Sequence, residues 1–195
     1  VREIGCDFLS ISSHKINAPK GVGALYVRDL SLLSPMIHGG VAQEFGYRGG
    51  TENVAGIVGF GKACEILSRE LKANRKKSNE LRIAFKEALA ERLNSLGLQH
   101  ILHINSVCEP SKILNIRFDD VDGQTLLLLL DSIGICVSAG SACRSHEAEP
   151  SHVLMAMGLS ADEARDSVRV SFSHMQERGT VMYAAMMMAQ CVAML

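Results

Sequence analysis

Two hydroxyls, an imidazole and a primary amine fall within residues 12–15. An apolar run at residues 7–11 precedes them and a turn with proline and glycine follows, so the pattern predicts an amine at the end of a strand. Strand ends are where α/β sheets place their chemistry. A lysine in a partly dry pocket, as Lys15 would be, can lose its proton and form a Schiff base, while Ser12 and His14 could hold a phosphate beside it. The alternative is a lysine in a solvated turn.

A second reactive group is the thiol of Cys143, which stands in a run of small residues that begins at Ser138. Small residues form exposed loops, and Arg144 and His146 supply positive charge that favours the thiolate. Cysteines in strand or helix patterns are usually buried and unreactive. We expect that state for four others: Cys6, Cys64, Cys136 and Cys191.

A metal site is the alternative for this loop, because Cys143, His146 and His152 have tolerable ligand spacing. A closed zinc site needs four ligands, and no second Cys/His pair stands at the spacing of a zinc finger. We therefore favour a nucleophilic thiol over a metal ligand.

Five segments together resemble the class V aminotransferase-like enzymes, which use pyridoxal phosphate, and within that group the cysteine desulfurases. The lysine segment reads Ser-x-His-Lys-x-x-x-Pro-Lys-Gly-x-Gly-x-Leu-Tyr-Val, and the thiol segment reads Ser-Ala-Gly-Ser-Ala-Cys-x-Ser, followed by Glu-Pro-Ser-His-Val-Leu. The resemblance covers nearly the whole chain, in the family's order. Its segments are 12–27, Gly39 to Asn53, Ile113 to Phe118, Val137 to Ser145 and Glu149 to Ser173.

The resemblance implies a cofactor site for pyridoxal 5'-phosphate. Lys15 would bind the cofactor covalently, and Ser12 and His14 would lie among its contacts. Thr51, at the end of a glycine-rich loop, would reach across a homodimer interface to the neighbouring subunit's cofactor phosphate. The chain departs from the family's usual residues at Asn17, Ala18, Val41, Ala42, Gly49, Ala139, Ser173 and His174.

The resemblance also implies the reaction, which is removal of sulfur from L-cysteine. Cys143 would receive the sulfur as a persulfide, L-alanine would leave, and Arg169 would clamp the substrate carboxylate. The persulfide would serve a sulfur-acceptor or scaffold protein in iron–sulfur cluster assembly or another transfer pathway. Arg169 could instead be a surface strand arginine, and we expect Asn115 to be structural.

Three other functions share parts of this pattern: a selenocysteine lyase, a generic class V aminotransferase, and a non-catalytic fragment that only dimerises or binds a sulfur acceptor. The fragment interpretation arises from length. Enzymes of this family are longer than these 195 residues, and several of their cofactor contacts would precede Val1. The chain is therefore either part of a longer enzyme or works with a separate second chain.

The composition of the chain limits the kinds of partner that it could bind. Net charge is −1 and there is no basic block, so nucleic acid is not a natural partner. No stretch has 18 uninterrupted apolar residues, so we place no membrane span, and the first residues do not form a signal peptide. Six cysteines without a framework spacing favour reduced thiols and a cytoplasmic location.

The expected fold is α/β: the C-terminal part of a fold type I pyridoxal-phosphate enzyme, with the edge of the large-domain sheet and a small α+β domain. We expect residues 1–55 in the large domain, 56–98 as linking helices and 99–195 as the small domain that carries the cysteine loop. Apolar periodicity predicts helices at 54–96, 123–133 (with five buried leucines), 151–157, 160–165 and 181–195. It predicts strands at 7–11, 23–27, 100–104, 113–118, 135–138 and 168–172, and residues 72–77 form a solvated face or a kink.

Overall fold

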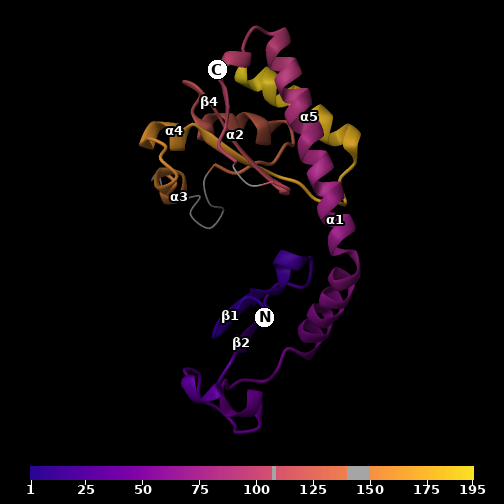
Figure 1. Ribbon diagram of the computed structural model, residues 1–195, viewed down its shortest axis with the longest axis vertical. Helices are drawn as coiled ribbons and strands as arrows, with labels where there is room; N and C mark the ends of the chain where they lie inside the picture. Colours follow the sequence, from indigo (N-terminus) through magenta and orange to yellow (C-terminus); the bar gives the residue numbers. More distant parts are fainter. Residues whose placement is uncertain (107–108, 140–149) are drawn as a thin grey trace. The chain divides into compact units, whose positions relative to one another are not determined.

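The computed structural model describes residues 1–106, 109–139 and 150–195 (Figure 1). The chain divides into two compact units, Val1–Leu71 and Lys72–Leu195, with the division inside one long helix. The elements are β1 (Phe8–Ser12), β2 (Gly23–Val27), α1 (Val54–Ser95), β3 (Leu102–Ile104), β4 (Ile113–Phe118), α2 (Gly123–Ser132), α3 (His152–Ala156), α4 (Ala161–Arg165), β5 (Ser167–Ser171) and α5 (Arg178–Val192).

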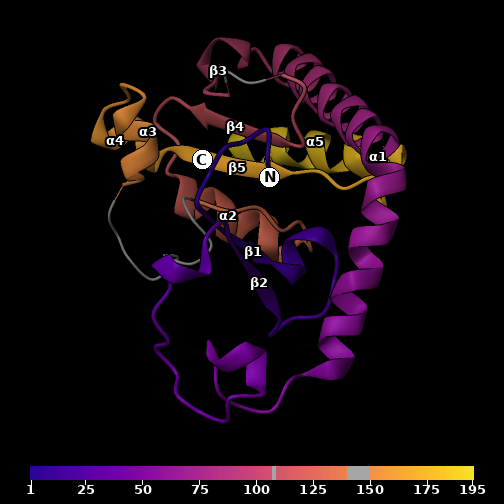
Figure 2. The ribbon, with the colours of Figure 1, turned by 60° about the horizontal axis from the view of Figure 1, so that its bottom comes forward.

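The first unit is built on a two-stranded antiparallel sheet, visible in Figure 2. β1 pairs with β2 from Phe8 opposite Val27 to Ser12 opposite Gly23. The two strands predicted for this region are therefore confirmed. The stretch 28–53 that follows is irregular apart from short 3₁₀ turns, and the first half of α1 completes the unit.

The second unit is built on a three-stranded antiparallel sheet in the order β3-β4-β5. Side chains of the central strand alternate in exposure: Leu114, Ile116 and Phe118 are buried, while Asn115 and Arg117 are half-buried. Because alternate residues of a strand point to opposite faces, the sheet has one apolar face and one polar face.

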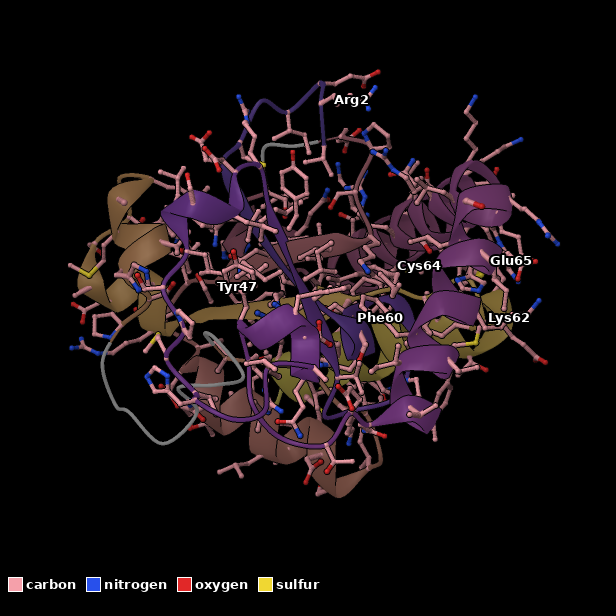
Figure 3. All side chains as sticks on the ribbon, turned by 90° about the horizontal axis from the view of Figure 1, so that it is seen from below. Arg2, Tyr47, Phe60, Lys62, Cys64 and Glu65 are labelled. Carbon is pink, nitrogen blue, oxygen red and sulfur yellow. The ribbon has the colours of Figure 1, made fainter. Side chains whose placement is uncertain are left out.

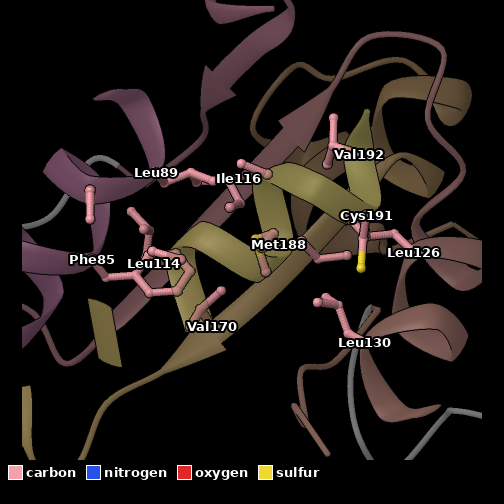
Figure 4. Packing of buried hydrophobic residues seen from close by; sticks show 14 of the residues in the cluster. Phe85, Leu89, Leu114, Ile116, Leu126, Leu130, Val170, Met188, Cys191 and Val192 are labelled. Atoms are coloured by element: carbon pink, nitrogen blue, oxygen red, sulfur yellow. The ribbon is translucent and has the colours of Figure 1, made fainter. Parts of the chain in front are cut away.

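The core of the second unit lies on that apolar face (Figure 4). Three helices contribute buried side chains to it: the second half of α1, α2 and α5. The rings of Phe85 on α1 and Phe172 after β5 meet edge to face, with centroids 5.4 Å apart, a favoured aromatic geometry. The core also contains Leu89, Leu126, Leu130, Val168, Val170, Met188, Cys191 and Val192.

Two predictions about the region around α2 are wrong. The leucine run does not pack throughout, because Leu126 and Leu130 are buried whereas Leu128 is 67% exposed. The five leucines span about one and a half turns of helix, so their side chains point in different directions around the helix axis and cannot all face one sheet. The predicted strand at 135–138 is reduced to a bridge at Ser138, since only that residue pairs with the neighbouring strand, opposite Arg169.

The other helices and strands predicted for the second unit are confirmed, although some of them begin or end at different residues. The first predicted strand begins only at Leu102, because Gln99–Ile101 forms a 3₁₀ turn. The polar stretch 72–77 continues as helix within α1 with its charged side chains exposed, so the solvated-face prediction is confirmed. Within the described residues, every helix is too short or too polar to cross a membrane.

Candidate functional site

Lys15 lies on a 3₁₀ turn, Ser13–Ile16, between β1 and β2. The side chains of Lys15 and His14 are exposed and Ser12 is half-buried. The turn is fixed through Ser13, which is 0% exposed. Its amide donates to the carbonyl of Val22 (3.1 Å), and its hydroxyl donates to the carbonyl oxygen of Pro19. Ser13 therefore anchors the turn that presents the amine.

Ser13 was missed as an anchor by sequence reasoning. A serine in a turn is usually exposed, so its residue type does not predict that it is buried. The residue that ends the turn, in contrast, has a type that suits its backbone: Asn17 has φ 64°, in the left-handed region. Asparagine tolerates that region better than other non-glycine residues.

The start of α1 packs directly on the lysine turn. A Cβ added to Gly56 would lie 2.3 Å from Cγ2 of Val22, and one added to Gly59 would lie 2.8 Å from Cγ of Pro19. Only glycine permits such close approach of a helix backbone. Asn53 fixes the helix start, because its Oδ1 accepts from the Gly56 amide (3.1 Å). The helix and the lysine turn thus form one local structure.

Thr51 ends the glycine-rich loop two residues before Asn53, and its side chain is exposed. The loop doubles back on itself, since the Gly49 amide donates to the carbonyl of Ile37 (2.7 Å). The sequence predicts only a flexible run here, whereas the structure gives the run a defined path. Thr51 belongs to the same unit as Lys15.

Arg169 lies on β5 in the second unit, half-buried and directly opposite Asn115 of β4. The Asn115 side chain is occupied, because its Oδ1 accepts from Nδ2 of Asn105 (2.8 Å), as the structural interpretation of Asn115 requires. Within the described part of the chain, no carboxylate forms an ion pair with Arg169. Its guanidinium therefore keeps its donors available for an anion.

Cys143 lies outside the described residues, as does His146, so the nucleophile and zinc interpretations both remain predictions. The segment that leads to Cys143 is described as far as Ala139. Ser138 and Arg169 exchange both backbone hydrogen bonds, at 3.1 and 2.7 Å. In the described ranges, no cluster of three or more His, Cys, Asp or Glu side chains could hold a metal.

A charged network joins β4 to α4, one of the two short helices that follow residue 149. Arg117 on β4 contacts Asp119, and its Nη2 lies 2.8 Å from Oε1 of Glu163 on α4. A hydrogen bond from His103 is the main cause that lowers the pKa of Asp119. Glu163 also accepts a hydrogen bond from the Ser160 amide (2.8 Å), which is the main cause of its own lowered pKa, and this bond is half of a capping box at the start of α4.

Of the four cysteines expected to be buried, only Cys191 is. Burial raises the pKa of the Cys191 thiol, as expected of an inert cysteine. Cys64 and Cys136 are exposed and Cys6 is half-buried, so the prediction is wrong for these three. Figure 3 shows Cys64 on α1, near Lys62 and Glu65; a helical pattern alone does not bury a residue where no apolar core faces it.

The structure therefore places His14 and Lys15 on one turn and Ser12 at the end of β1 just before it, with Thr51 in the same unit. Arg169 lies in the other unit, with its backbone bonded to the segment that precedes the cysteine loop. A lysine, an imidazole and hydroxyls at a strand end can hold an aldehyde that carries a phosphate. Arg169 forms no ion pair with a carboxylate of the described residues, and a guanidinium can hold a carboxylate by two parallel hydrogen bonds.

Known proteins resemble this chain over most of its length. The family model for aminotransferase class V matches residues 1–183. The cysteine desulfurase IscS of Dictyoglomus turgidum is 45% identical over 169 residues, which are 87% of this chain and 42% of that protein. A solved NifS-like protein has 34% identity and a TM-score of 0.82, over 100% of this chain and 48% of its own. The structure described as SspA in complex with cysteine has 34% identity and a TM-score of 0.56, over 88% of this chain and 45% of its own.

The chain spans less than half the length of the relatives it matches. Because the family model covers 183 of the 195 residues, the chain belongs to the class V aminotransferase family.

Proposed function

We propose that this chain supplies one half of a pyridoxal-phosphate-dependent cysteine desulfurase. The observation that carries the proposal is the lysine turn, where Ser12, His14 and Lys15 meet at the end of β1. Its relatives are named cysteine desulfurases, and one similar structure is described with cysteine bound. The rest of the active site would come from the part of those relatives that this chain does not span.

The residues present fit the cofactor. The Lys15 amine would hold the aldehyde, and the Ser12 hydroxyl and the His14 imidazole would serve its phosphate, with Thr51 of a neighbouring subunit as a further donor. Bound pyridoxal phosphate supplies an electron sink for carbanion chemistry at the substrate. The Lys15 amine, when free, would take and return the proton on the substrate Cα.

Cys143 and Arg169 would handle the substrate itself. The guanidinium of Arg169 holds the carboxylate of L-cysteine by two parallel hydrogen bonds. The thiolate of Cys143 attacks the substrate sulfur, so a sulfur–sulfur bond forms as the bond between sulfur and Cβ breaks. The electron pair stays with the carbon fragment, which is protonated and leaves as L-alanine. Cys143 is left as a persulfide, which a second thiol can accept.

We infer that the enzyme is a cytoplasmic homodimer that passes sulfur to an acceptor or scaffold protein, with iron–sulfur cluster assembly as one destination. Support for the dimer comes from Thr51, which ends an exposed loop rather than lying in a packed interior. Residues 1–55 would complete a larger cofactor domain, 56–98 would link it to the small domain, and 99–195 would form that small domain.

Intact-mass measurement tests the proposal. The chain is combined with the part of its relatives that it lacks, loaded with pyridoxal phosphate and given L-cysteine. We expect the mass of one added sulfur, removable by a reducing thiol and absent in Cys143→Ser. The matched control is Cys136→Ser, an exposed thiol, which should retain the added sulfur. Absence of sulfur from the unsubstituted chain, or its persistence in Cys143→Ser, would contradict the proposal and favour a non-catalytic role.

A further inference from the structure

Gln43 joins the two ends of the glycine-rich loop through one side-chain atom. Its Oε1 accepts from the amide of Gly40 (3.1 Å) and from the amide of Gly50 (2.9 Å). An amide oxygen has two lone pairs, so both are used. Gly50 precedes Thr51 directly, so this oxygen fixes the backbone from which the Thr51 side chain emerges.

Beyond these two bonds, the ends of the loop are joined by the backbone hydrogen bond from the Gly49 amide to the Ile37 carbonyl (2.7 Å). Its apolar side chains face solvent, and Val41 and Phe45 are each 88% exposed. The two ends of the loop approach each other so closely that a Cβ on Gly39 would lie 2.6 Å from Cα of Gly49. Within the described residues, the side-chain hydrogen bonds that cross this loop are the two that end on Gln43.

We propose that Gln43 is a positioning residue that fixes Thr51 for the phosphate of the neighbouring subunit's cofactor. The inference rests on the proposed function, because Thr51 is assigned its ligand there. A donor held in place before the ligand arrives loses less conformational freedom on binding, and the affinity rises accordingly. Loss of the Gln43 oxygen frees Gly50 and Thr51 to sample other conformations.

The test is a double-substitution cycle with the cofactor dissociation constant as readout, measured by titration of the assembled protein with pyridoxal phosphate. Gln43→Met keeps the side-chain length and removes the acceptor, and Thr51→Val removes the hydroxyl. We expect each to raise the dissociation constant by about tenfold, as one lost hydrogen bond does. We expect the double variant to be no weaker than Thr51→Val alone, because Gln43 acts through Thr51.

A matched control lies in the second unit, where Oε1 of Gln176 accepts from the amide of Ser173 (2.8 Å). Gln176→Met should leave the dissociation constant unchanged. If Gln43→Met yields too little folded protein, Gln43→Asn replaces it, since the shorter side chain cannot reach both amides. Amide hydrogen exchange of the paired strands β1 and β2, followed in parallel, confirms that the first unit of each variant is folded.

Three outcomes would overturn the inference. An unchanged dissociation constant in Gln43→Met, with a raised one in Thr51→Val, leaves the proposed function standing and removes the role of Gln43. Effects that multiply in the double variant show that Gln43 acts independently of Thr51. An unchanged constant in Thr51→Val shows that Thr51 does not contact the phosphate, which also withdraws that part of the proposed function.

Discussion

The buried large apolar side chains of the described chain all lie in the second unit, between Leu81 and Val192. In the first unit, the buried residues are Ser13, Gly49 and Gly56. The second unit is thus held by apolar burial, at about 25 cal/mol per Å² of surface removed from water. The first is held by backbone hydrogen bonds and glycine contacts around the lysine turn and the Thr51 loop.

The two units therefore differ in role: apolar burial stabilises the second unit, and the proposed cofactor residues lie in the first. The cofactor residues proposed here stand on the unit without an apolar core, so substitutions there should change binding more than the unfolding of the second unit. Large apolar side chains of the first unit are exposed, among them Met36, Val41 and Phe45. In other proteins, extensive apolar surface marks a place that another polypeptide covers.

The sharpest test of the comparison uses one residue type in both units. Phe85 is 2% exposed in the core and Phe45 is 88% exposed in the loop. We expect Phe85→Ala to lower the free energy of unfolding of the second unit by about 3–5 kcal/mol, because it leaves a cavity against Phe172. Phe45→Ala should change it by less than about 0.5 kcal/mol. Urea unfolding followed by circular dichroism measures both, and equal effects would remove the distinction between the units.

Two glycines of one loop give the next largest effect. A Cβ on Gly49 would lie 2.6 Å from the carbonyl oxygen of His38, whereas one on Gly40 would meet nothing closer than 3.8 Å. Gly49→Ala should open the loop at a local cost of about 1–3 kcal/mol, and Gly40→Ala should not.

Amide hydrogen exchange across residues 37–51 measures this opening. Faster exchange confined to the loop in Gly49→Ala would support a first unit held by local backbone contacts. Faster exchange throughout the second unit, or equal behaviour of the two variants, would contradict it.

Helix caps give a smaller contrast. Ser160 caps α4 in a complete capping box, with its hydroxyl accepting from the Glu163 amide (3.2 Å). Ser160→Ala should cost the second unit about 1 kcal/mol. Asp29 accepts from the Ser31 amide (2.9 Å) in an exposed turn of the first unit. Thermal unfolding of the second unit should be unaffected by Asp29→Ala, and a matching drop in both variants would argue that the units unfold as one.

The smallest effects concern pH and have opposite signs at two carboxyl groups. A hydrogen bond from the buried Arg82 lowers the pKa of Glu109 (2.7 Å), so its stabilisation is present above the ordinary pKa of 4.5 and lost as pH falls further. Burial and nearby aspartates raise the pKa of Asp166, so its ionisation destabilises the fold as pH rises through that raised pKa.

We therefore expect Glu109→Gln to lower stability at neutral pH and to have no effect in strong acid. Asp166→Asn should raise stability at neutral pH by about 0.5 kcal/mol or less. Urea midpoints of the second unit measure both, at pH values on either side of the ordinary carboxyl pKa values of 3.8 and 4.5. The same sign for the two variants at neutral pH would refute this electrostatic interpretation.

Much of the fold could be predicted from sequence because it depends on local patterns. The apolar stripe of α1 predicts a helix to within a residue at each end, and Gly97, with φ 74°, follows its last turn, as glycine often does after a helix. The cap at Ser160 and the alternation in β4 are equally local. Predictions failed where neighbours decide, as for the exposed Leu128 and for the stretch before Ser138.

The residues of the candidate site likewise fall into those that could be predicted from sequence and those that could not. Lys15, His14 and Ser12 could be predicted to share a turn because they are adjacent in sequence. The roles of Ser13 and Gln43 could not, since each depends on a backbone group that the fold brings near: the Pro19 carbonyl and the Gly50 amide. The spacing of residues in a sequence does not predict such contacts between a side chain and a distant backbone group.

The claim on which the account depends most is that the Lys15 amine holds the cofactor. Borohydride reduction of the assembled, cofactor-loaded protein, followed by digestion and mass spectrometry, locates the attached pyridoxyl group. The account predicts that group on Lys15 and its loss in Lys15→Ala, with Lys20→Ala, an exposed lysine of the same turn region, still labelled. A pyridoxyl group on Lys20 or on any other lysine, or none at all, would contradict it.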